Sequence, residues 1–120
     1  MRVVVAHHPL VDASELGGEP VAANGARALA LLAAHGVELV RSGHLHHAFV
    51  LPAVPGRSLG VHCGTSTSSR GRGAEAGVNT LNWIEIGPAE IAVSCRRLAP
   101  ARGEFVEVEA RRFPRARPAA

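Results

Sequence analysis

Residues 24–47, NGARALALLAAHGVELVRSGHLHH, contain the pattern that decides the fold. Asn24 is typical of a helix N-cap, and apolar side chains recur after it at every third or fourth position, which is the spacing of one helix face. Gly36 suits the position that follows a helix. Residues 37–42, VELVRS, are then rich in apolar residues, as a buried strand is. The segment therefore predicts a helix followed by a strand.

A short strand is also predicted before this segment, at residues 2–6, RVVVA, where continuous β-branched residues indicate burial on both faces. Strand, helix and strand in this order form a βαβ unit, in which the two strands are parallel and the crossover is right-handed. The carboxyl ends of parallel strands meet at one edge of the sheet, where open α/β sheets bind their ligands. We therefore expect the residues after position 6 and after position 42 to lie side by side.

The remaining chain has the pattern of an antiparallel meander. Turns at residues 55–56 and 87–88 and a small-residue loop at residues 64–78 separate short apolar runs. Strands are predicted at residues 47–51, 59–63, 80–86, 91–97 and 104–112. The predicted fold class is α/β, with one βαβ unit followed by a mostly antiparallel meander.

The composition excludes several classes of protein. With 120 residues, 47% hydrophobic and 19% charged, the chain has the make-up of one globular domain or of part of one. No apolar run reaches the ~18–20 residues of a membrane span. The five-residue apolar run near Met1 is too short for the core of a signal peptide. The sequence thus predicts a cytoplasmic protein that has no membrane partner.

The charge balance is basic, but it does not indicate a nucleic-acid partner. The chain has 13 Arg and no Lys, and its formal net charge is +3. It also has 21 Ala, 13 Gly and 8 Pro, residues that share GC-rich codons with Arg, so the Arg content is explained by genome composition. Aromatic residues make up only 3%, which leaves few side chains on which bases could stack. Cys63 and Cys95 form no C-x-x-C pair and are expected to be reduced thiols.

Histidines are the most informative residues of the chain. His7 and His8 follow the first predicted strand, and His44, His46 and His47 follow the second. Neutral imidazole is the commonest metal ligand in proteins, and a group of imidazoles suits Zn, Mn, Fe or Ni. His44 and His46 are two residues apart, so in an extended segment they would project to the same side. The two clusters therefore predict a metal site at the carboxyl edge of the sheet.

Two short motifs in the chain resemble a known family. AHHP at residues 6–9 and SGHLHH at residues 42–47, about 35 residues apart, resemble the last two motifs of the calcineurin-like metallophosphoesterases. The similarity is greatest to the bacterial cyclic-nucleotide-phosphodiesterase-like branch, which the loop GTSTSSRGRG at residues 64–73 and Asn82 also resemble. The resemblance implies the second half of that family's α/β/β/α sandwich.

The same resemblance implies a function and a set of ligands. The implied reaction is the hydrolysis of a phosphoester, in particular a phosphodiester, by a metal-bound hydroxide at a site that holds two divalent ions (Mn, Fe or Zn). The implied substrate is a phosphoester small molecule or nucleotide. The residues that match the family's metal ligands are His7, His44 and His46.

The chain departs from the family in one large respect. The family's earlier motifs, D-x-H, G-D and G-N-H-[DE], have no counterpart, and Asp12 is the only aspartate. We therefore expect residues 1–113 to be the C-terminal part of the domain and residues 114–120 to be a disordered basic tail. On this interpretation the isolated chain is inactive, and its partner is the N-terminal half, whether the chain is a truncated gene product, a remnant or a separately expressed fragment.

Two alternatives remain open at this stage. One is a small module that binds a single metal ion through three histidines without hydrolysis, since three His ligands and an open position suit zinc. The other is a remnant fold that binds nothing specific. The D-x-H, G-D and G-N-H motifs would distinguish the hydrolase from these two alternatives, and this sequence does not contain them.

Weaker candidates surround the predicted metal ligands. His8 either contacts a phosphate oxygen or packs in its loop, and Arg70 either holds a phosphoester bidentately or belongs to a solvated loop. His62 lies within a predicted strand, where a structural role is favoured. His35 is explained as a cation near a helix C-terminus.

Overall fold

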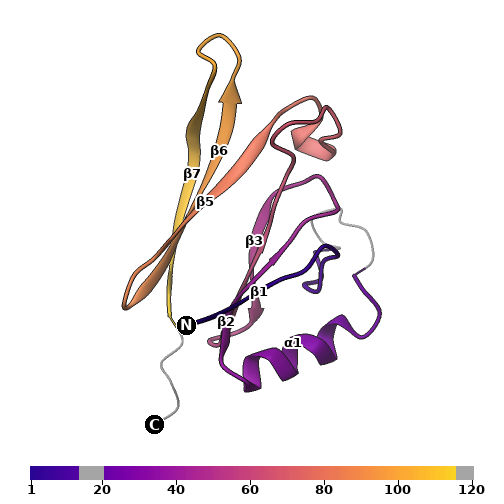
Figure 1. The fold of residues 1–120 in the computed structure, drawn as a ribbon, viewed down its shortest axis with the longest axis vertical. Coiled ribbons are helices and arrows are strands. Elements are labelled where there is room, and N and C mark those ends of the chain that lie inside the picture. Colours follow the sequence, from indigo (N-terminus) through magenta and orange to yellow (C-terminus); the bar gives the residue numbers. More distant parts are fainter. Residues whose placement is uncertain (14–20, 116–120) are drawn as a thin grey trace.

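The structure, a computed structural model, describes residues 1–13 and 21–115. In these residues one helix and two sheets form an α/β fold (Figure 1). The elements, in chain order, are β1 (Arg2–Val5), α1 (Gly25–Ala34), β2 (Val37–Ser42), β3 (Phe49–Val54), β4 (Ser58–His62), the 3-10 turn η2 (Gly73–Glu75), β5 (Thr80–Ile86), β6 (Glu90–Ala99) and β7 (Glu104–Pro114). The described part of the chain has no helix long and apolar enough to span a bilayer.

The predicted βαβ unit is confirmed. β1 and β2 are parallel neighbours, with Val4 opposite Val40, and α1 connects them. β4 then lies on the other side of β2, parallel to it, while β3 pairs antiparallel with β4 at the far edge. The order of this sheet is β1-β2-β4-β3, and the second sheet is the antiparallel meander β5-β6-β7. The chain therefore has the predicted fold class, although β4 is inserted into the first sheet rather than continuing a meander.

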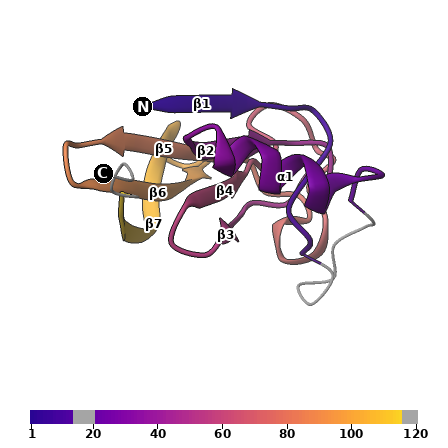
Figure 2. The same cartoon turned by 90° about the horizontal axis from the view of Figure 1, so that it is seen from below.

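β1 differs from its prediction because it is an exposed edge strand. The sequence indicates burial on both faces, yet Val3 is 44% and Val5 is 74% exposed. In the described residues only β2 pairs with this strand, and Figure 2 shows β1 at one border of the molecule. Its apolar side chains are therefore uncovered.

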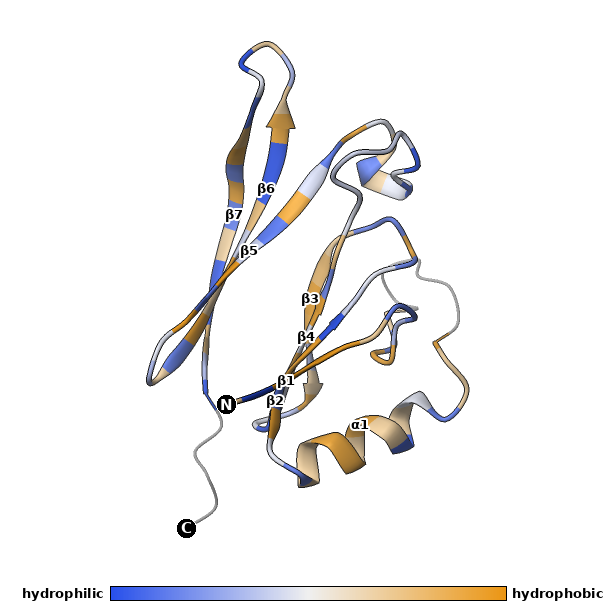
Figure 3. Ribbon diagram, in the orientation of Figure 1, coloured by the Kyte–Doolittle hydropathy of each residue, from blue (hydrophilic) through white to orange (hydrophobic). Residues whose placement is uncertain are grey.

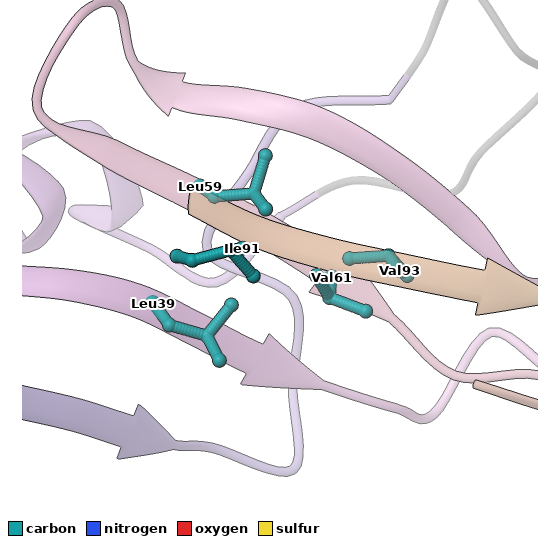
Figure 4. Packing of buried hydrophobic residues seen from close by; sticks show 5 residues of the cluster. All are labelled: Leu39, Leu59, Val61, Ile91 and Val93. Carbon is teal, nitrogen blue, oxygen red and sulfur yellow. The ribbon is translucent and has the colours of Figure 1, made fainter. Parts of the chain in front are cut away.

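Two hydrophobic clusters hold the layers together. Leu39, Leu59 and Val61 of the first sheet pack against Ile91 and Val93 of β6 (Figure 4). On the opposite face of the sheet, a second cluster joins α1 and the segment before it to β2, through Val11, Leu29, Val37 and Val40. Hydrophobic residues make up most of β1 and α1, whereas β6 and β7 alternate between hydrophobic and hydrophilic residues (Figure 3). The first sheet is thus the central layer between α1 and the second sheet.

The helix ends show one match and one difference. α1 begins directly after Asn24, as predicted, but Asn24 has a φ of 63° and its side chain makes no capping hydrogen bond. In this left-handed conformation the residue turns the chain into the helix through its backbone alone. Gly36, with a φ of 73°, follows the helix as predicted.

The first two residues of the predicted tail, Pro114 and Arg115, are part of the folded structure. Pro114 is the last residue of β7, and Arg115 donates two hydrogen bonds of 2.8 Å to the carboxylate of Glu38 in β2. Residues 114 and 115 therefore belong to the fold and not to a disordered tail. Residues 116–120, the rest of the predicted tail, lie outside the described residues.

Candidate metal centre

The parallel pairing of β1 and β2 brings two histidine segments to one edge of the sheet. The Ala6 amide donates to the Arg41 carbonyl (2.9 Å), and the Gly43 amide donates to the His7 carbonyl (3.1 Å). The ladder therefore continues one step beyond the last residue of each strand. His44 follows Gly43, so its side chain starts beside that of His7, as the sequence analysis predicts.

Three imidazoles meet at this edge. The His7 Nε2 and His44 Nδ1 atoms are 3.2 Å apart, and the His8 and His44 rings have their centroids 4.4 Å apart. Each of these three residues offers a ring nitrogen, and the three nitrogens lie within 4.8 Å of one another. Two nitrogens bound to one tetrahedral zinc are about 3.3 Å apart when each bond is ~2.0–2.1 Å. The His7–His44 pair already has this spacing, and a ring nitrogen of His8 lies within 4.8 Å of both.

The backbone around His44 is a strained turn and not an extended segment. His44 has a φ of 76° and His46 a φ of 55°. The Leu45 amide donates to the Gly43 carbonyl (3.0 Å), which closes a γ-turn centred on His44. Because the segment is not extended, strand alternation does not place His44 and His46 on one side, and this step of the sequence argument is wrong. Leu45, only 4% exposed, anchors the turn to the core.

In the described residues His46 is not a member of the three-imidazole group. It is half-buried, and its carbonyl accepts a hydrogen bond from the Arg72 amide (3.0 Å). The structure thus gathers His7, His44 and His8 of the histidines that the sequence singles out. His8, expected either to contact phosphate or to pack in its loop, is exposed next to the other two rings. Its place directly after His7 at a strand end is the sequence signal that points to it.

His62 supports the turn between β2 and β3, residues 43–48, which we call the histidine turn. The sequence favours a structural role for His62 but does not show which segment it supports. His62 is 1% exposed, its Nδ1 atom lies 2.9 Å from the His47 carbonyl, and its ring stacks on Phe49 with centroids 4.4 Å apart. Burial lowers the pKa of His62, so the ring is neutral near pH 7. A neutral ring with its proton on Nδ1 donates to the His47 carbonyl and ties the turn to β4.

The loop at residues 64–78 packs against the same turn. Glu75 is buried, and its carboxylate accepts hydrogen bonds from the Thr80 hydroxyl (2.8 Å) and from the Ala48 amide (3.2 Å). A Cβ atom at Gly64 would lie 2.3 Å from the Glu75 carboxylate, so glycine is required for this close approach. Arg70 is exposed, and its amide donates to the Ser68 hydroxyl (3.2 Å). The loop therefore contacts the turn through the Glu75 carboxylate and the Arg72 amide, and a substrate contact of Arg70 stays a prediction.

Comparisons with known proteins identify the fold of this chain. No known family and no curated protein matches the sequence. Among solved structures, Vps29 from Chaetomium thermophilum, complexed with a RaPID-derived cyclic peptide, aligns with 98% of this chain and 58% of its own, with a TM-score of 0.58 and 12% identity. A predicted phosphoesterase from Streptococcus pneumoniae aligns with 72% of this chain and 45% of its own, with a TM-score of 0.54 and 19% identity.

The chain has part of the calcineurin-like metallophosphoesterase fold. The resemblance seen in the sequence is therefore confirmed at the level of fold. A third structure with this fold, wild-type Vps29 from Entamoeba histolytica, is complexed with Zn²⁺ and has a TM-score of 0.51 and 19% identity, over 81% of this chain and 49% of its own. The present chain thus spans about half the length of the metallophosphoesterase-fold structures that it matches.

Proposed function

We propose that His7, His44 and His8 hold a divalent metal ion, and that this chain is the C-terminal part of a metal-dependent phosphoester hydrolase. The observation that supports the proposal best is the set of three ring nitrogens within 4.8 Å at the carboxyl edge of two parallel strands. The backbone strain at His44 also supports a functional site, because a non-glycine residue at a φ of 76° persists only where the surrounding structure holds it in place. The likeness to a zinc-complexed Vps29 makes zinc the first metal to test.

In this proposal the chain supplies half of a reaction centre. A divalent ion would provide a nucleophilic hydroxide at neutral pH and would stabilise charge on the phosphoryl oxygens. The imidazoles of His7, His8 and His44 would hold this ion, while β4 and the loop before β5 keep the turn in place. His46 is proposed, from the family resemblance, as a ligand of a second ion. The proposed substrate is a phosphoester small molecule or nucleotide.

A partner polypeptide is part of the same proposal. This chain covers only 45% and 58% of two matched structures, and among the described residues β1 has one unpaired edge and exposed valines. We propose that an N-terminal half of the fold pairs with this edge and adds the carboxylate ligands. Its carboxylates are needed because no Asp or Glu belongs to the three-imidazole group in the described residues. The cytoplasmic location and the lack of a nucleic-acid partner stay predictions.

A metal-binding module without hydrolysis is the second candidate function. It is favoured by the all-histidine ligand group, which suits one zinc ion but not a bridged pair. Proteins of this fold also bind peptides, as the Vps29 complex with a cyclic peptide shows for that protein. The two candidates differ in one measurable property, which is turnover after addition of the N-terminal half.

Metal binding is tested first, by titrating the purified chain with Zn²⁺ and Mn²⁺ and counting bound ions by mass spectrometry of the desalted protein. We expect about one ion per chain, and a loss of affinity of more than tenfold in His44→Ala and in His8→Ala. His35→Ala, at the far end of α1, is the matched control and should bind normally. A larger loss in His46→Ala than in His8→Ala would show that His46, not His8, completes the site.

Activity is tested next, with a chromogenic phosphodiester. We expect no turnover by the chain alone, because the ligand group lacks the carboxylate that would bridge two ions ~3.5–4 Å apart. Turnover that appears only with a matched N-terminal half, and disappears in His44→Ala, supports the hydrolase. Metal binding that never leads to turnover with any such half leaves the metal-binding module as the function.

A further inference from the structure

An open groove lies beside the imidazole group, along the carboxyl ends of β1 and β2. It has a volume of about 410 Å³, and it is lined by Val5, His7, Arg41 and Cys63 together with the short segments between them. This volume falls in the ~300–1,000 Å³ range of small-molecule sites. His7 belongs to both the groove and the imidazole group, so a molecule in the groove lies next to the proposed metal ion.

The polar wall of the groove contains a guanidinium with no carboxylate partner in the described residues. Arg41 lies opposite Val5 on one side and Val61 on the other, so all three side chains project to the face that packs on the second sheet. Val61 is covered by β6, but Val5 is 74% exposed, which leaves Arg41 at the open border of that face. Among the described residues its guanidinium makes one hydrogen bond, a long one from Nη2 to the Cys63 sulfur (3.6 Å).

The Arg41 side chain therefore has unmet hydrogen-bonding capacity. Its Nε atom is buried and has no partner in the described part of the chain. By contrast, Arg102, Arg112 and Arg115 each contact a glutamate. An arginine stays charged at all ordinary pH values, and a half-buried charge without a counter-ion is unfavourable. A bound anion would remove this cost.

We propose that Arg41 binds the phosphoryl group of the substrate in this groove, beside the ion held by His7. The inference rests on the proposed function and deepens it, since it names a residue that recognises the substrate. A guanidinium presents several N–H donors in one plane, which match two oxygens of a phosphoryl group. Val5 and Ala6 also line the groove, and their apolar side chains suit the uncharged part of a phosphoester.

The experiment measures phosphate binding by equilibrium dialysis of the 120-residue chain with labelled inorganic phosphate, with and without Mn²⁺. We expect Arg41→Gln to weaken phosphate binding about tenfold or more, because a charged hydrogen-bond donor is lost. Arg41→Lys should retain part of the affinity, since it keeps the charge but not the planar donor pair. Arg57→Gln is the matched control, because Arg57 is exposed in the turn before β4, and its affinity should equal that of the wild type.

Bound Mn²⁺ is counted in the same samples, so that the two proposals can fail separately. Wild-type phosphate affinity in Arg41→Gln overturns the inference about Arg41 and leaves the metal site intact. A loss of Mn²⁺ in Arg41→Gln also overturns it, since Arg41 would then support the metal site instead of the anion. If the wild type binds no metal ion but still binds phosphate through Arg41, the proposed function fails and the anion site stands. Competition by acetate as strong as that by phosphate would contradict the phosphoryl class.

Discussion

His44 combines a candidate ligand with an unfavourable backbone conformation. Its φ of 76° lies in a region that L-residues avoid. Its side chain is exposed, so burial of the ring does not offset the free-energy cost of this conformation. Such positions cost about 1–3 kcal/mol each and cluster at functional sites. The residue therefore stabilises the fold less than glycine would, which is expected where a ligand is needed at that position.

The first prediction concerns His44→Gly. Glycine adopts a positive φ without strain but loses ~0.5–1 kcal/mol through its greater freedom in the unfolded chain. We expect the free energy of unfolding without metal to rise by about 1 kcal/mol, while metal affinity is lost. Urea denaturation and a zinc titration measure the two effects. His8→Gly is the control: it should lose metal affinity without any gain in stability, because His8 has no positive φ. A His44→Gly variant less stable than the wild type would contradict the strain argument.

At the scale of elements, the histidine turn between β2 and β3 is held by its neighbours and not by its own sequence. β4 contributes His62, which contacts the His47 carbonyl, and the η2 segment contributes Glu75, which accepts from the Ala48 amide. Two backbone hydrogen bonds to distant segments add to this support, from the Arg72 amide to the His46 carbonyl and from the Gly43 amide to the His7 carbonyl. The geometry of the metal ligands is therefore set by packing between elements.

The second prediction tests this support through His62. His62→Leu leaves the His47 carbonyl without its donor, which costs roughly 1–3 kcal/mol of stability, and it should also weaken metal binding because the turn is released. His62→Asn places an amide N–H near the position of Nδ1 and should restore metal affinity more than stability, since the stacking on Phe49 is still lost. Denaturation and zinc titration are compared for both variants. Equal zinc affinity in His62→Leu and in the wild type would show that the turn keeps its shape alone.

At the scale of the whole molecule, an ion pair joins two distant parts of the chain. Arg115, directly after β7, contacts Glu38 of β2, and its Nη1 atom also donates to the Gly87 carbonyl (3.0 Å). The pair links the first sheet to the end of the second one and is largely buried, with 22% of the Arg115 side chain and 13% of the Glu38 side chain exposed. It therefore resists the separation of the two sheets at the end opposite to the histidines.

The third prediction is a pH dependence that arises from this pair. The hydrogen bonds from Arg115 hold the pKa of Glu38 below its ordinary value, although burial opposes them. A carboxyl whose pKa is lower in the folded state stabilises the fold above its ordinary pKa, and this contribution is lost as the pH falls through the folded-state pKa. We expect Glu38→Gln to be less stable than the wild type at pH 7 and to lose less stability on acidification. Urea denaturation at a series of pH values measures this, and parallel curves for both proteins would contradict it.

The fourth prediction concerns the free edge of β1. In the described residues β1 pairs only with β2, and a free strand edge with exposed valines favours pairing with another chain, so the isolated protein should associate. Val5→Lys places a charge on this edge and should raise the monomer fraction in size-exclusion chromatography with light scattering. Val108→Lys is the matched control, because Val108 is also exposed, at 52%, but lies on β7. A monomeric wild type, or equal effects of the two variants, would show that the β1 edge does not drive association.

The sequence alone determined the parts of the fold that depend on local periodicity. The helix after Asn24, the strand at residues 37–42 and the strand at residues 80–86 follow from the spacing of apolar residues, and the structure has all three. The meeting of His7 with His44 was also predictable, because parallel strands joined by one helix must end at the same edge. Each of these features is fixed by residues close together in the chain or by the handedness of one βαβ unit.

Only the tertiary structure decided which strands have neighbours and how the site is shaped. The apolar run of β1 indicates burial, but its exposure depends on a partner strand that local pattern does not report. The insertion of β4 beside β2 pairs residues 20 positions apart, and Arg115 contacts Glu38 at a separation of 77 positions. The turn at His44 is likewise held by hydrogen bonds to distant segments. Long-range contacts of this kind are chosen by the packing of complete elements against one another, and the same packing brings His8 rather than His46 beside His7 and His44.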